Sequence, residues 1–324
     1  MTHAIRFHTT GGPEVLAWEK VDVGSPGAGE VRVRHTAVGL NFIDIYQRSG
    51  LYRVPLPSGL GSEAAGVIEE VGADVSDLKV GDRVAYGASP LGAYCEARLI
   101  RADQLLKLPD GIDDRSAAAM MLKGLTAQYL IRQTYRVKAG DTILLHAAAG
   151  GVGTILSQWA RHLGATVIGT VGSEEKAQMA RAHGCDHVIL YNREDFVARV
   201  LEITGGRKVT VVYDSVGQDT FLRSLDCLAP LGMAALFGQS SGSVAPLDLG
   251  VLAQKGSLFV TRPTLFTYAA ERSNLVAMAA ELFDVVGSGA VKIEIGQTYA
   301  LKDAAKAHAD LAARKTTASS VFVL

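Results

Sequence analysis

The chain has 324 residues, of which 48% are hydrophobic and 20% are charged. This composition is typical of globular proteins and the length predicts about two domains, so a small single module, a disordered chain and a coiled coil are excluded. The 32 basic residues nearly balance the 33 acidic ones, and a net charge of −1 favours neither nucleic acid nor a membrane surface as a partner. Three cysteines are too few for a disulfide framework, which favours a cytoplasmic location.

No segment predicts targeting or membrane insertion. The N-terminal residues carry charge where a signal peptide would need an apolar run. Two long uncharged stretches, residues 142–160 and 227–247, are interrupted by glycines and by polar side chains or prolines. We therefore expect both stretches to be buried core rather than membrane spans.

The first third of the chain is predicted to be β structure. Residues 30–34 alternate polar and apolar side chains, and residues 66–72 and 79–85 are short apolar segments bounded by glycine turns. Such alternation is typical of strands in a sheet with one solvated face. These patterns predict a small β-rich domain over about residues 1–110.

From about residue 113, strands are predicted to alternate with helices. The candidate strands are residues 142–146, 166–171, 187–191, 209–214 and 233–237, with helical segments between them. Parallel strands joined by helices form a doubly wound sheet that is covered on both faces. A last strand of this sheet is expected at 258–261, followed by a helix over about 268–286 that leads into residues 297–301, and the chain ends in a strand-like segment at 319–324.

A glycine-rich turn follows the first of these strands and opens an amphipathic helix. Gly150 and Gly151 would let the backbone approach a pyrophosphate, and Gly153 would let the helix pack closely against the strand. The N–H groups at the start of the helix, including that of Val152, would bind phosphate oxygens. Ala148 stands where such a turn usually begins with glycine, so a turn that only packs the helix is the alternative.

The end of the second strand bears on the choice of dinucleotide. An NAD-selective site usually carries an acid about 20 residues after the glycines, but Gly172 and Ser173 stand there instead. They leave room for a 2′-phosphate and Lys176 supplies a cation, whereas Glu174 and Glu175 would oppose the phosphate if they faced it. We therefore expect NADPH as the cofactor, and the alternative is an ordinary solvated helical turn.

Six short motifs occur in order along the whole chain, at residues 41–44, 59–66, 81–84, 122–126, 147–153 and 212–217. Together they resemble the zinc-independent quinone oxidoreductases of the medium-chain dehydrogenase/reductase superfamily. The resemblance implies an α/β protein with a GroES-like β-rich catalytic domain over 1–125, a Rossmann nucleotide-binding domain over 126–263, and a C-terminal segment over 264–324 that returns to the catalytic domain. It also implies reduction of quinones or related activated carbonyl compounds by NADPH in a cleft between the domains.

Zinc alcohol dehydrogenases of the same superfamily bind their catalytic metal at positions that correspond here to about Asn41, Ser62 and Lys123. A catalytic zinc site needs three protein ligands, which these side chains do not supply, so we expect no metal there. The four clustered cysteines of the structural zinc lobe are also missing from the sequence. One metal-like cluster, at residues 183–187, would divide its ligands between a helix end and a strand start, and we expect no metal there either.

The resemblance also assigns site residues. It places Asn41 near the nicotinamide, and it places Tyr46 and Tyr52 along the cleft, where a phenol would donate a hydrogen bond or a proton. A buried ring with a locally satisfied hydroxyl is the alternative for both tyrosines. Family positions that contact the cofactor are occupied here by Thr126, Lys176, Tyr191, Ser215, Phe237, Gly238, Gln239, Ser240 and Arg314. A surface or packing role is the alternative for Tyr191 and Arg314.

Other functions and the oligomeric state also follow from the sequence as hypotheses. An enoyl or alkenal reductase of the same superfamily is one alternative. A nucleotide-binding protein with a crystallin-like or RNA-binding role is another, although the chain has no basic run. Residues 257–261 form an apolar strand without edge protection, which predicts a homodimer made by pairing two such edges.

Overall fold

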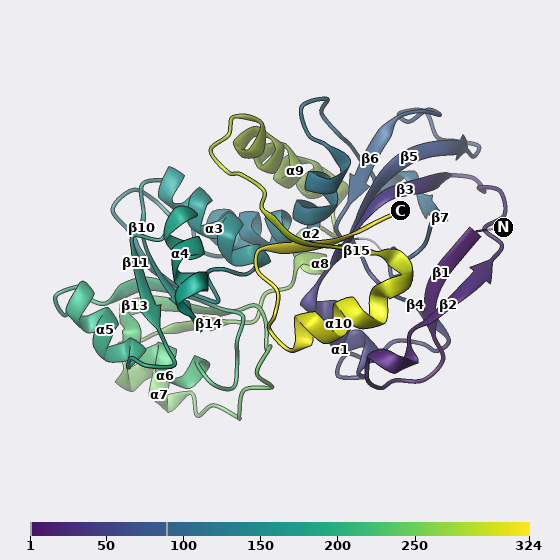
Figure 1. Cartoon of the computed structure of the whole chain (residues 1–324). Helices are drawn as coiled ribbons and strands as arrows, with labels where there is room; N and C mark the ends of the chain where they lie inside the picture. Colours follow the sequence, from purple (N-terminus) through teal and green to yellow (C-terminus); the bar gives the residue numbers. More distant parts are fainter. Residues whose placement is uncertain (1, 89) are drawn as a thin grey trace. The chain divides into compact units, whose positions relative to one another are not determined.

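The computed structural model describes residues 2–88 and 90–324, which fold into two compact units (Figure 1). The first unit comprises Met1–Leu125, Ala269–Gly287 and Ile293–Leu324, and the second comprises Thr126–Tyr268 and Ser288–Lys292. The C-terminal part of the chain thus belongs mainly to the first unit, and a five-residue piece of it belongs to the second.

The first unit is built on two sheets. The smaller has the order β2-β1-β4, and the larger has the order β15-β16-β3-β5-β6-β8, with β7 also paired to β3. The strands of the first unit are β1 (Thr2–Phe7), β2 (Ala17–Val21), β3 (Glu30–Leu40), β4 (Ser58–Gly59), β5 (Ala64–Val71), β6 (Arg83–Tyr86), β7 (Ala97–Arg101), β8 (Leu106–Lys107), β15 (Ile295–Ala300) and β16 (Ser319–Val323). Strand β16 pairs antiparallel with β3, so the C-terminal strand completes the sheet begun near the N-terminus (Figure 1).

Apolar side chains from both sheets share one core. Phe7 of β1, Val33 of β3, Ile68 of β5 and Phe322 of β16 are all almost completely buried in it. The other elements of the first unit are α1 (Phe42–Arg48), α9 (Arg272–Gly287), α10 (Ala304–Ala312) and the short 3₁₀ turns η1 (Pro13–Val15), η2 (Ala102–Gln104) and η5 (Leu301–Asp303), and α10 contributes Ala304 and Ala307 to the core. The predicted strand at 79–85 is shorter than expected, because residues 79–82 form a turn in which the Asp82 carboxylate accepts the Lys79 N–H.

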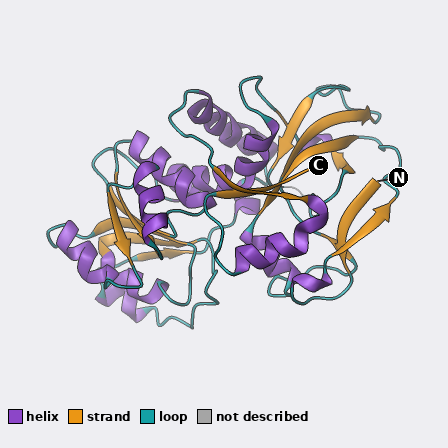
Figure 2. Cartoon of the chain, in the orientation of Figure 1, coloured by secondary structure: helices purple, strands orange, loops and turns teal. Residues whose placement is uncertain are grey.

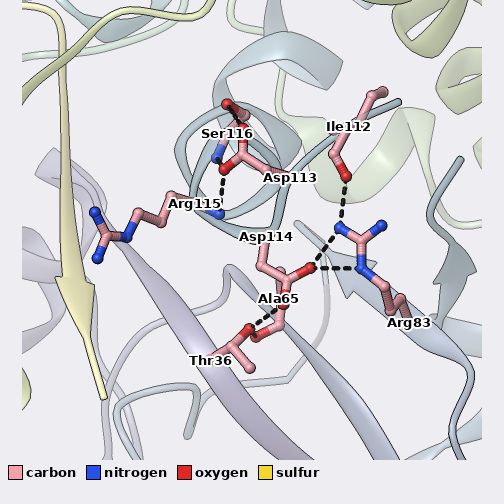
Figure 3. Close-up of polar contacts among 8 residues, drawn as sticks. All are labelled: Thr36, Ala65, Arg83, Ile112, Asp113, Asp114, Arg115 and Ser116. Atoms are coloured by element: carbon pink, nitrogen blue, oxygen red, sulfur yellow. Dashed lines mark hydrogen bonds and ion pairs between the residues drawn. The ribbon is translucent and has the colours of Figure 1, made fainter. Parts of the chain in front are cut away.

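Helix α2 (Asp114–Tyr129) begins in the first unit and continues through a π-helical turn at Leu130–Thr134 in the second. At its start, the Asp113 carboxylate accepts the Ser116 N–H at 3.0 Å and so caps the helix. Asp114 accepts two hydrogen bonds from the Arg83 guanidinium and one from Thr36 Oγ1 (Figure 3). The arginine of the 81–84 motif therefore fixes the start of α2 to the sheet.

The second unit contains a six-stranded parallel sheet with the order β11-β10-β9-β12-β13-β14. Its strands are β9 (Thr142–His146), β10 (Thr166–Val171), β11 (His187–Leu190), β12 (Val209–Asp214), β13 (Leu228–Leu236) and β14 (Phe259–Thr261). The helices are α3 (Gly151–His162), α4 (Glu174–Ala182), α5 (Phe196–Ile203), α6 (Phe221–Ser224), α7 (Gly250–Gln254) and α8 (Leu265–Tyr268), with a 3₁₀ turn η4 (Leu225–Cys227).

The direction of the crossovers places helices on both faces of this parallel sheet. The chain moves outward from β9 through β10 to β11, and then returns to β12 on the other side of β9. Right-handed crossovers therefore put α3 and α4 on one face and α5 and α6 on the other, so that the strands lie between helices (Figure 2). This arrangement confirms the predicted doubly wound fold. Within the described residues, no helix has the length and the apolar character needed to cross a membrane.

Candidate functional site

The glycine-rich turn lies between β9 and α3, at the point where the strand order of the parallel sheet reverses. Ligands of open α/β sheets bind at such a switch point. Gly150 is the N-cap residue of α3, and within the described part of the chain no side chain caps this helix start. The first N–H groups of a helix have no intrahelical partner, so those of Gly151, Val152 and Gly153 are suited to phosphate oxygens.

Gly153 is required by the packing of this turn. A Cβ atom at Gly153 would lie 2.4 Å from the Ala147 carbonyl oxygen and 2.6 Å from that of Ala148. Ala147 itself has a φ of +54°, and the Ala148 N–H is bound to the Thr170 carbonyl oxygen of β10. The turn is thus packed closely between β9, β10 and the start of α3. This agrees with the prediction that Gly153 lets the helix pack closely against the strand.

A buried histidine lies behind the turn, and sequence reasoning gave it no role. His146 ends β9, and its Nδ1 and Nε2 atoms lie 2.9 Å from Thr170 Oγ1 and 2.8 Å from Ser224 Oγ. Burial lowers the pKa of His146, so the ring is neutral and acts as a hydrogen-bonding link. It joins β9, β10 and α6 beneath the candidate cofactor site.

The end of β10 brings together several of the predicted cofactor residues. Ser173 is the N-cap of α4, and its hydroxyl accepts the Lys176 N–H at 3.3 Å. Gly172 leaves room for Tyr191, because a Cβ at 172 would lie 2.9 Å from the Tyr191 hydroxyl oxygen. Asn192, which the sequence analysis missed, donates from Nδ2 to the Gly172 carbonyl oxygen at 2.8 Å. The tyrosine and the asparagine therefore both converge on the Gly172–Ser173 turn.

The acids that follow this turn are exposed, and one of them has a cation beside it. Glu174 Oε1 lies 3.5 Å from Arg193 Nη1. Because this guanidinium offsets part of the negative charge of Glu174, the acid opposes a phosphate less than its formal charge suggests. Arg193 lies two residues after Tyr191, and the sequence analysis did not single it out.

The loops after β12 and β13 are joined to each other. The Ser240 N–H donates to the Ser215 carbonyl oxygen at 3.1 Å, and the Phe237 N–H donates to that of Asp214 at 2.8 Å. A Cβ at Gly238 would lie 2.7 Å from the Ser215 carbonyl oxygen, so the two loops approach more closely there than any other residue would allow. The structure thus brings Ser215, Phe237, Gly238 and Ser240 together, and Gln239 lies within the same loop.

Two further predicted cofactor residues lie elsewhere. Thr126 is buried on α2, where the second unit begins. Arg314 follows α10 in the first unit, with an exposed side chain and a φ of +58°. Both remain predicted contacts of the cofactor.

Glu63 is the centre of a buried polar cluster in the first unit. Its Oε2 atom accepts a hydrogen bond from Asn41 Nδ2 at 2.7 Å and another from Lys123 Nζ at 2.9 Å. Its Oε1 atom accepts the Leu122 N–H at 2.8 Å. Glu63 is 0% exposed. It lies in the 59–66 motif, but only the folded chain shows that it joins the 41–44 and 122–126 motifs.

The residues that the resemblance places at zinc-ligand positions are Asn41, Ser62 and Lys123, and two of them belong to the Glu63 cluster. Asn41 and Lys123 both donate hydrogen bonds to the Glu63 carboxylate. Ser62, which precedes Glu63 in the sequence, is buried. Among residues 2–88 and 90–324, no group of three or more His, Cys, Asp or Glu side chains is arranged to hold a metal ion. In the 183–187 segment, the side chains of His183 and Asp186 both contact backbone groups.

Tyr46 and Tyr52 lie against each other. Their ring centroids are 5.1 Å apart, and the Tyr52 N–H donates to the Tyr46 carbonyl oxygen at 2.9 Å. Tyr46 is buried on α1 and also packs against Phe42, whereas Tyr52 is partly exposed on the loop after the helix. The structure therefore brings the two predicted phenols together on the segment that follows Asn41.

A second buried network surrounds Asp44, the last residue of the 41–44 motif, to which the sequence analysis assigned no role of its own. Asp44 Oδ2 accepts the Asn41 N–H at 2.9 Å and the Tyr94 hydroxyl at 2.8 Å. The Tyr94 hydroxyl also lies 3.1 Å from His308 Nε2, and His308 Nδ1 faces Arg48. Burial raises the pKa of Asp44 to about 7, and burial, aided by the Arg48 charge, lowers the pKa of His308 to about 3.

Known proteins resemble this chain over its whole length. Family models match residues 27–135, as an alcohol dehydrogenase GroES-like domain, and residues 151–281, as a zinc-binding dehydrogenase. A quinone oxidoreductase of Pseudomonas aeruginosa is 56% identical, with 100% of both chains covered. A 2-haloacrylate reductase of Burkholderia is 50% identical, with 100% of this chain and 99% of the relative covered. The structure of an Escherichia coli quinone oxidoreductase complexed with NADPH has a TM-score of 0.97 and 51% identity, covering 99% of this chain and 100% of that one.

Proposed function

The chain belongs to the quinone oxidoreductases of the medium-chain dehydrogenase/reductase superfamily, and on that premise we propose that it transfers reducing equivalents from NADPH to quinones or related activated carbonyl compounds without zinc. The observation that carries this proposal is the full-length match to quinone oxidoreductases, one of which has been solved with NADPH. One matching family model is named for zinc-binding dehydrogenases, but the resemblance places Asn41, Ser62 and Lys123 at the positions of the catalytic zinc ligands, and these side chains do not supply a zinc site.

The residues present fit NADPH. The start of α3 is without a side-chain cap in the described chain, and Gly153 lets the turn fold under it, which suits a pyrophosphate. Ser173, Lys176 and Tyr191 surround the Gly172 turn, which suits a 2′-phosphate. We assign cofactor binding to Asn41, Thr126, Gly150, Gly151, Val152, Gly153, Gly172, Ser173, Lys176, Tyr191, Ser215, Phe237, Gly238, Gln239, Ser240 and Arg314.

When bound, the reduced nicotinamide supplies two electrons and a proton as a hydride equivalent. The chain's own residues then have to orient the acceptor and stabilise the charge that develops on its oxygen. We assign this role to Asn41, Tyr46 and Tyr52. Glu63 holds the Asn41 amide in place, and a phenol hydroxyl can donate to an oxygen that becomes negative.

The relative named 2-haloacrylate reductase supports a second candidate function, the reduction of an activated carbon–carbon double bond. The purified chain should be assayed with NADPH against a panel of quinones and against 2-chloroacrylate. We expect every active quinone to have a higher kcat/KM than the acrylate. Rapid turnover of the acrylate together with no oxidation of NADPH by any quinone would instead assign the second function.

We also propose that the protein forms a homodimer through the edge of the parallel sheet. Strand β14 is the last strand of that sheet, and Phe259 and Val260 on it are 55% and 39% exposed. Pairing two such edges about a twofold axis would cover both. Light scattering at micromolar concentration should give the mass of a dimer, and a monomer mass would reject this assembly.

The three cysteines are buried free thiols, which supports a cytoplasmic location.

A further inference from the structure

The buried cluster around Glu63 brings two nitrogen donors to one oxygen atom. Asn41 Nδ2 and Lys123 Nζ both bind Glu63 Oε2, so the amide and the ammonium are neighbours. The carboxylate of Glu63 only accepts hydrogen bonds, which fixes the Asn41 amide with its nitrogen toward Glu63. Strands and helices far apart in sequence hold this arrangement, because Glu63 precedes β5, Asn41 precedes α1 and Lys123 lies on α2.

The donors of this cluster are not all used. An ammonium has three N–H groups, and within residues 2–88 and 90–324 the Lys123 ammonium has Glu63 as its one polar partner. The Asn41 amide likewise has a second N–H. Next to Glu63 in sequence, the buried Ser62 Oγ has no hydrogen-bond partner in the described chain. Buried polar groups are normally satisfied, so the remaining N–H groups of Lys123 and Asn41, which meet at Glu63 Oε2, indicate a site for an external oxygen atom.

The charges of the cluster leave it able to receive a negative charge. Lys123 and Glu63 form a buried pair whose formal charges cancel. The nearby Asp44 is completely buried, and this burial raises its pKa to about 7, so below that pH the carboxyl is mostly neutral. An acceptor oxygen that becomes negative would therefore meet a cation without an excess of carboxylate charge around it.

We propose that Lys123 is a further catalytic residue, whose ammonium binds the acceptor oxygen and stabilises the negative charge that forms on it. The inference rests on the proposed quinone reductase function. The quinone receives two electrons and one proton as a hydride equivalent while the nicotinamide is oxidised, which leaves a hydroquinone monoanion. Its negative oxygen is held by Lys123, with Asn41 as a second donor, until a proton from solvent gives the neutral hydroquinone.

The kinetic test compares Lys123→Met, Lys123→Arg and the control Lys302→Met, which removes an exposed lysine of the same unit. Removal of one preorganised donor of this kind lowers kcat by about 10²- to 10³-fold, and we expect that loss for Lys123→Met. The dissociation constant of NADPH should stay within about twofold, since the ammonium acts on the acceptor. Lys123→Arg keeps the charge and should recover at least about tenfold of the loss, and Lys302→Met should behave as the unmodified chain.

Stability must be separated from catalysis, because Lys123→Met leaves Glu63 buried without its cation. The double variant Glu63→Gln with Lys123→Met removes both charges and should fold, as judged by circular dichroism and thermal unfolding. We expect it to lose kcat to a similar extent as Lys123→Met. A folded double variant with the kcat of the unmodified chain would overturn the role of Lys123.

A binding measurement tests the site without turnover. 4-Nitrophenol resembles a hydroquinone, and its absorbance distinguishes the phenolate from the phenol. We expect the unmodified chain and Lys123→Arg to bind the phenolate and so lower the apparent pKa of the probe, whereas the two Lys123→Met proteins should not. Equal probe spectra in all variants would overturn the inference. If none of the quinones supports oxidation of NADPH by the unmodified chain, the proposed function fails. The probe spectra still decide in that case whether Lys123 binds a negative oxygen.

Discussion

Replacing Gly153 by alanine tests how the cofactor turn is packed. The added Cβ would lie 2.4 Å and 2.6 Å from the carbonyl oxygens of Ala147 and Ala148, whereas ordinary contact begins near 3.4 Å. Both oxygens are backbone atoms, so the turn or the start of α3 has to move by about 1 Å. Overpacking of this kind costs about 1 to 3 kcal/mol, and a displacement of about 1 Å is enough to disturb a binding site. We expect Gly153→Ala to unfold at a lower temperature and to bind NADPH at least about tenfold more weakly.

Gly150→Ala is the matched comparison within the same turn. Its Cβ would meet one atom, the Ala147 carbonyl oxygen at 3.2 Å, and its φ of −85° suits any residue. We expect its thermal unfolding to match that of the unmodified chain, and its NADPH affinity to fall because the added methyl group blocks close approach of the pyrophosphate. Gly111→Ala, where a Cβ meets nothing within 4 Å, is the neutral control.

Thermal unfolding and fluorescence titration with NADPH separate the two effects. A Gly153→Ala protein with unchanged stability and unchanged affinity would refute the packing argument. A Gly150→Ala protein that binds NADPH as tightly as the unmodified chain would refute close approach of the cofactor at Gly150, while leaving the argument for Gly153 intact.

Three further predictions concern single side chains. Lys176→Ala should weaken NADPH binding by about ten- to a hundredfold and leave NADH binding nearly unchanged, because a charge-assisted hydrogen bond is worth about 1.5 to 3 kcal/mol; equal losses for both dinucleotides in a titration would argue against a 2′-phosphate contact. Tyr52→Phe should lower kcat by about tenfold with little change in NADPH affinity, and unchanged kinetics would assign the ring to packing. Burial raises the pKa of Asp44 from 3.8 to about 7, so the folded chain binds the extra proton and stability falls as the pH rises from about 4 to 7. The unfolding temperature of the unmodified chain should fall between pH 5 and pH 8, and Asp44→Asn should reduce that fall. Identical pH profiles of the unfolding temperature for the two proteins would contradict a raised pKa of the buried Asp44 carboxyl.

The parallel sheet could be predicted closely because its strands are nearly continuous apolar runs. The predicted bounds 142–146, 166–171 and 209–214 are those of β9, β10 and β12. Strand β13 begins at Leu228, five residues earlier than expected, because Pro230 and Gly232 hide its first half and Leu231 has a φ of +62°. Strand patterns do not anticipate such a distortion, which the pairing with β12 accommodates by a shift in register.

The buried polar clusters could not be predicted, because their members are far apart in the sequence. Glu63 and Lys123 are separated by 60 residues, and Arg48 and His308 by 260. Each of these polar side chains taken alone is expected to be at least partly exposed. The free-energy cost of burying them is offset when the partners meet and form hydrogen bonds. The motifs at 41–44, 59–66 and 122–126 pointed to the right segments, but the hydrogen bonds that join them at Glu63 appear in the folded chain alone.

The reduction of quinones by NADPH without zinc is the activity proposed for this chain. Its most direct test counts products under anaerobic conditions, with protein that has been treated with a chelator and shown by elemental analysis to be free of metal. We expect one hydroquinone to form for each NADPH oxidised, at the rate of the untreated protein. A failure to form hydroquinone, or activity that is lost on chelation and restored by zinc, would contradict the account.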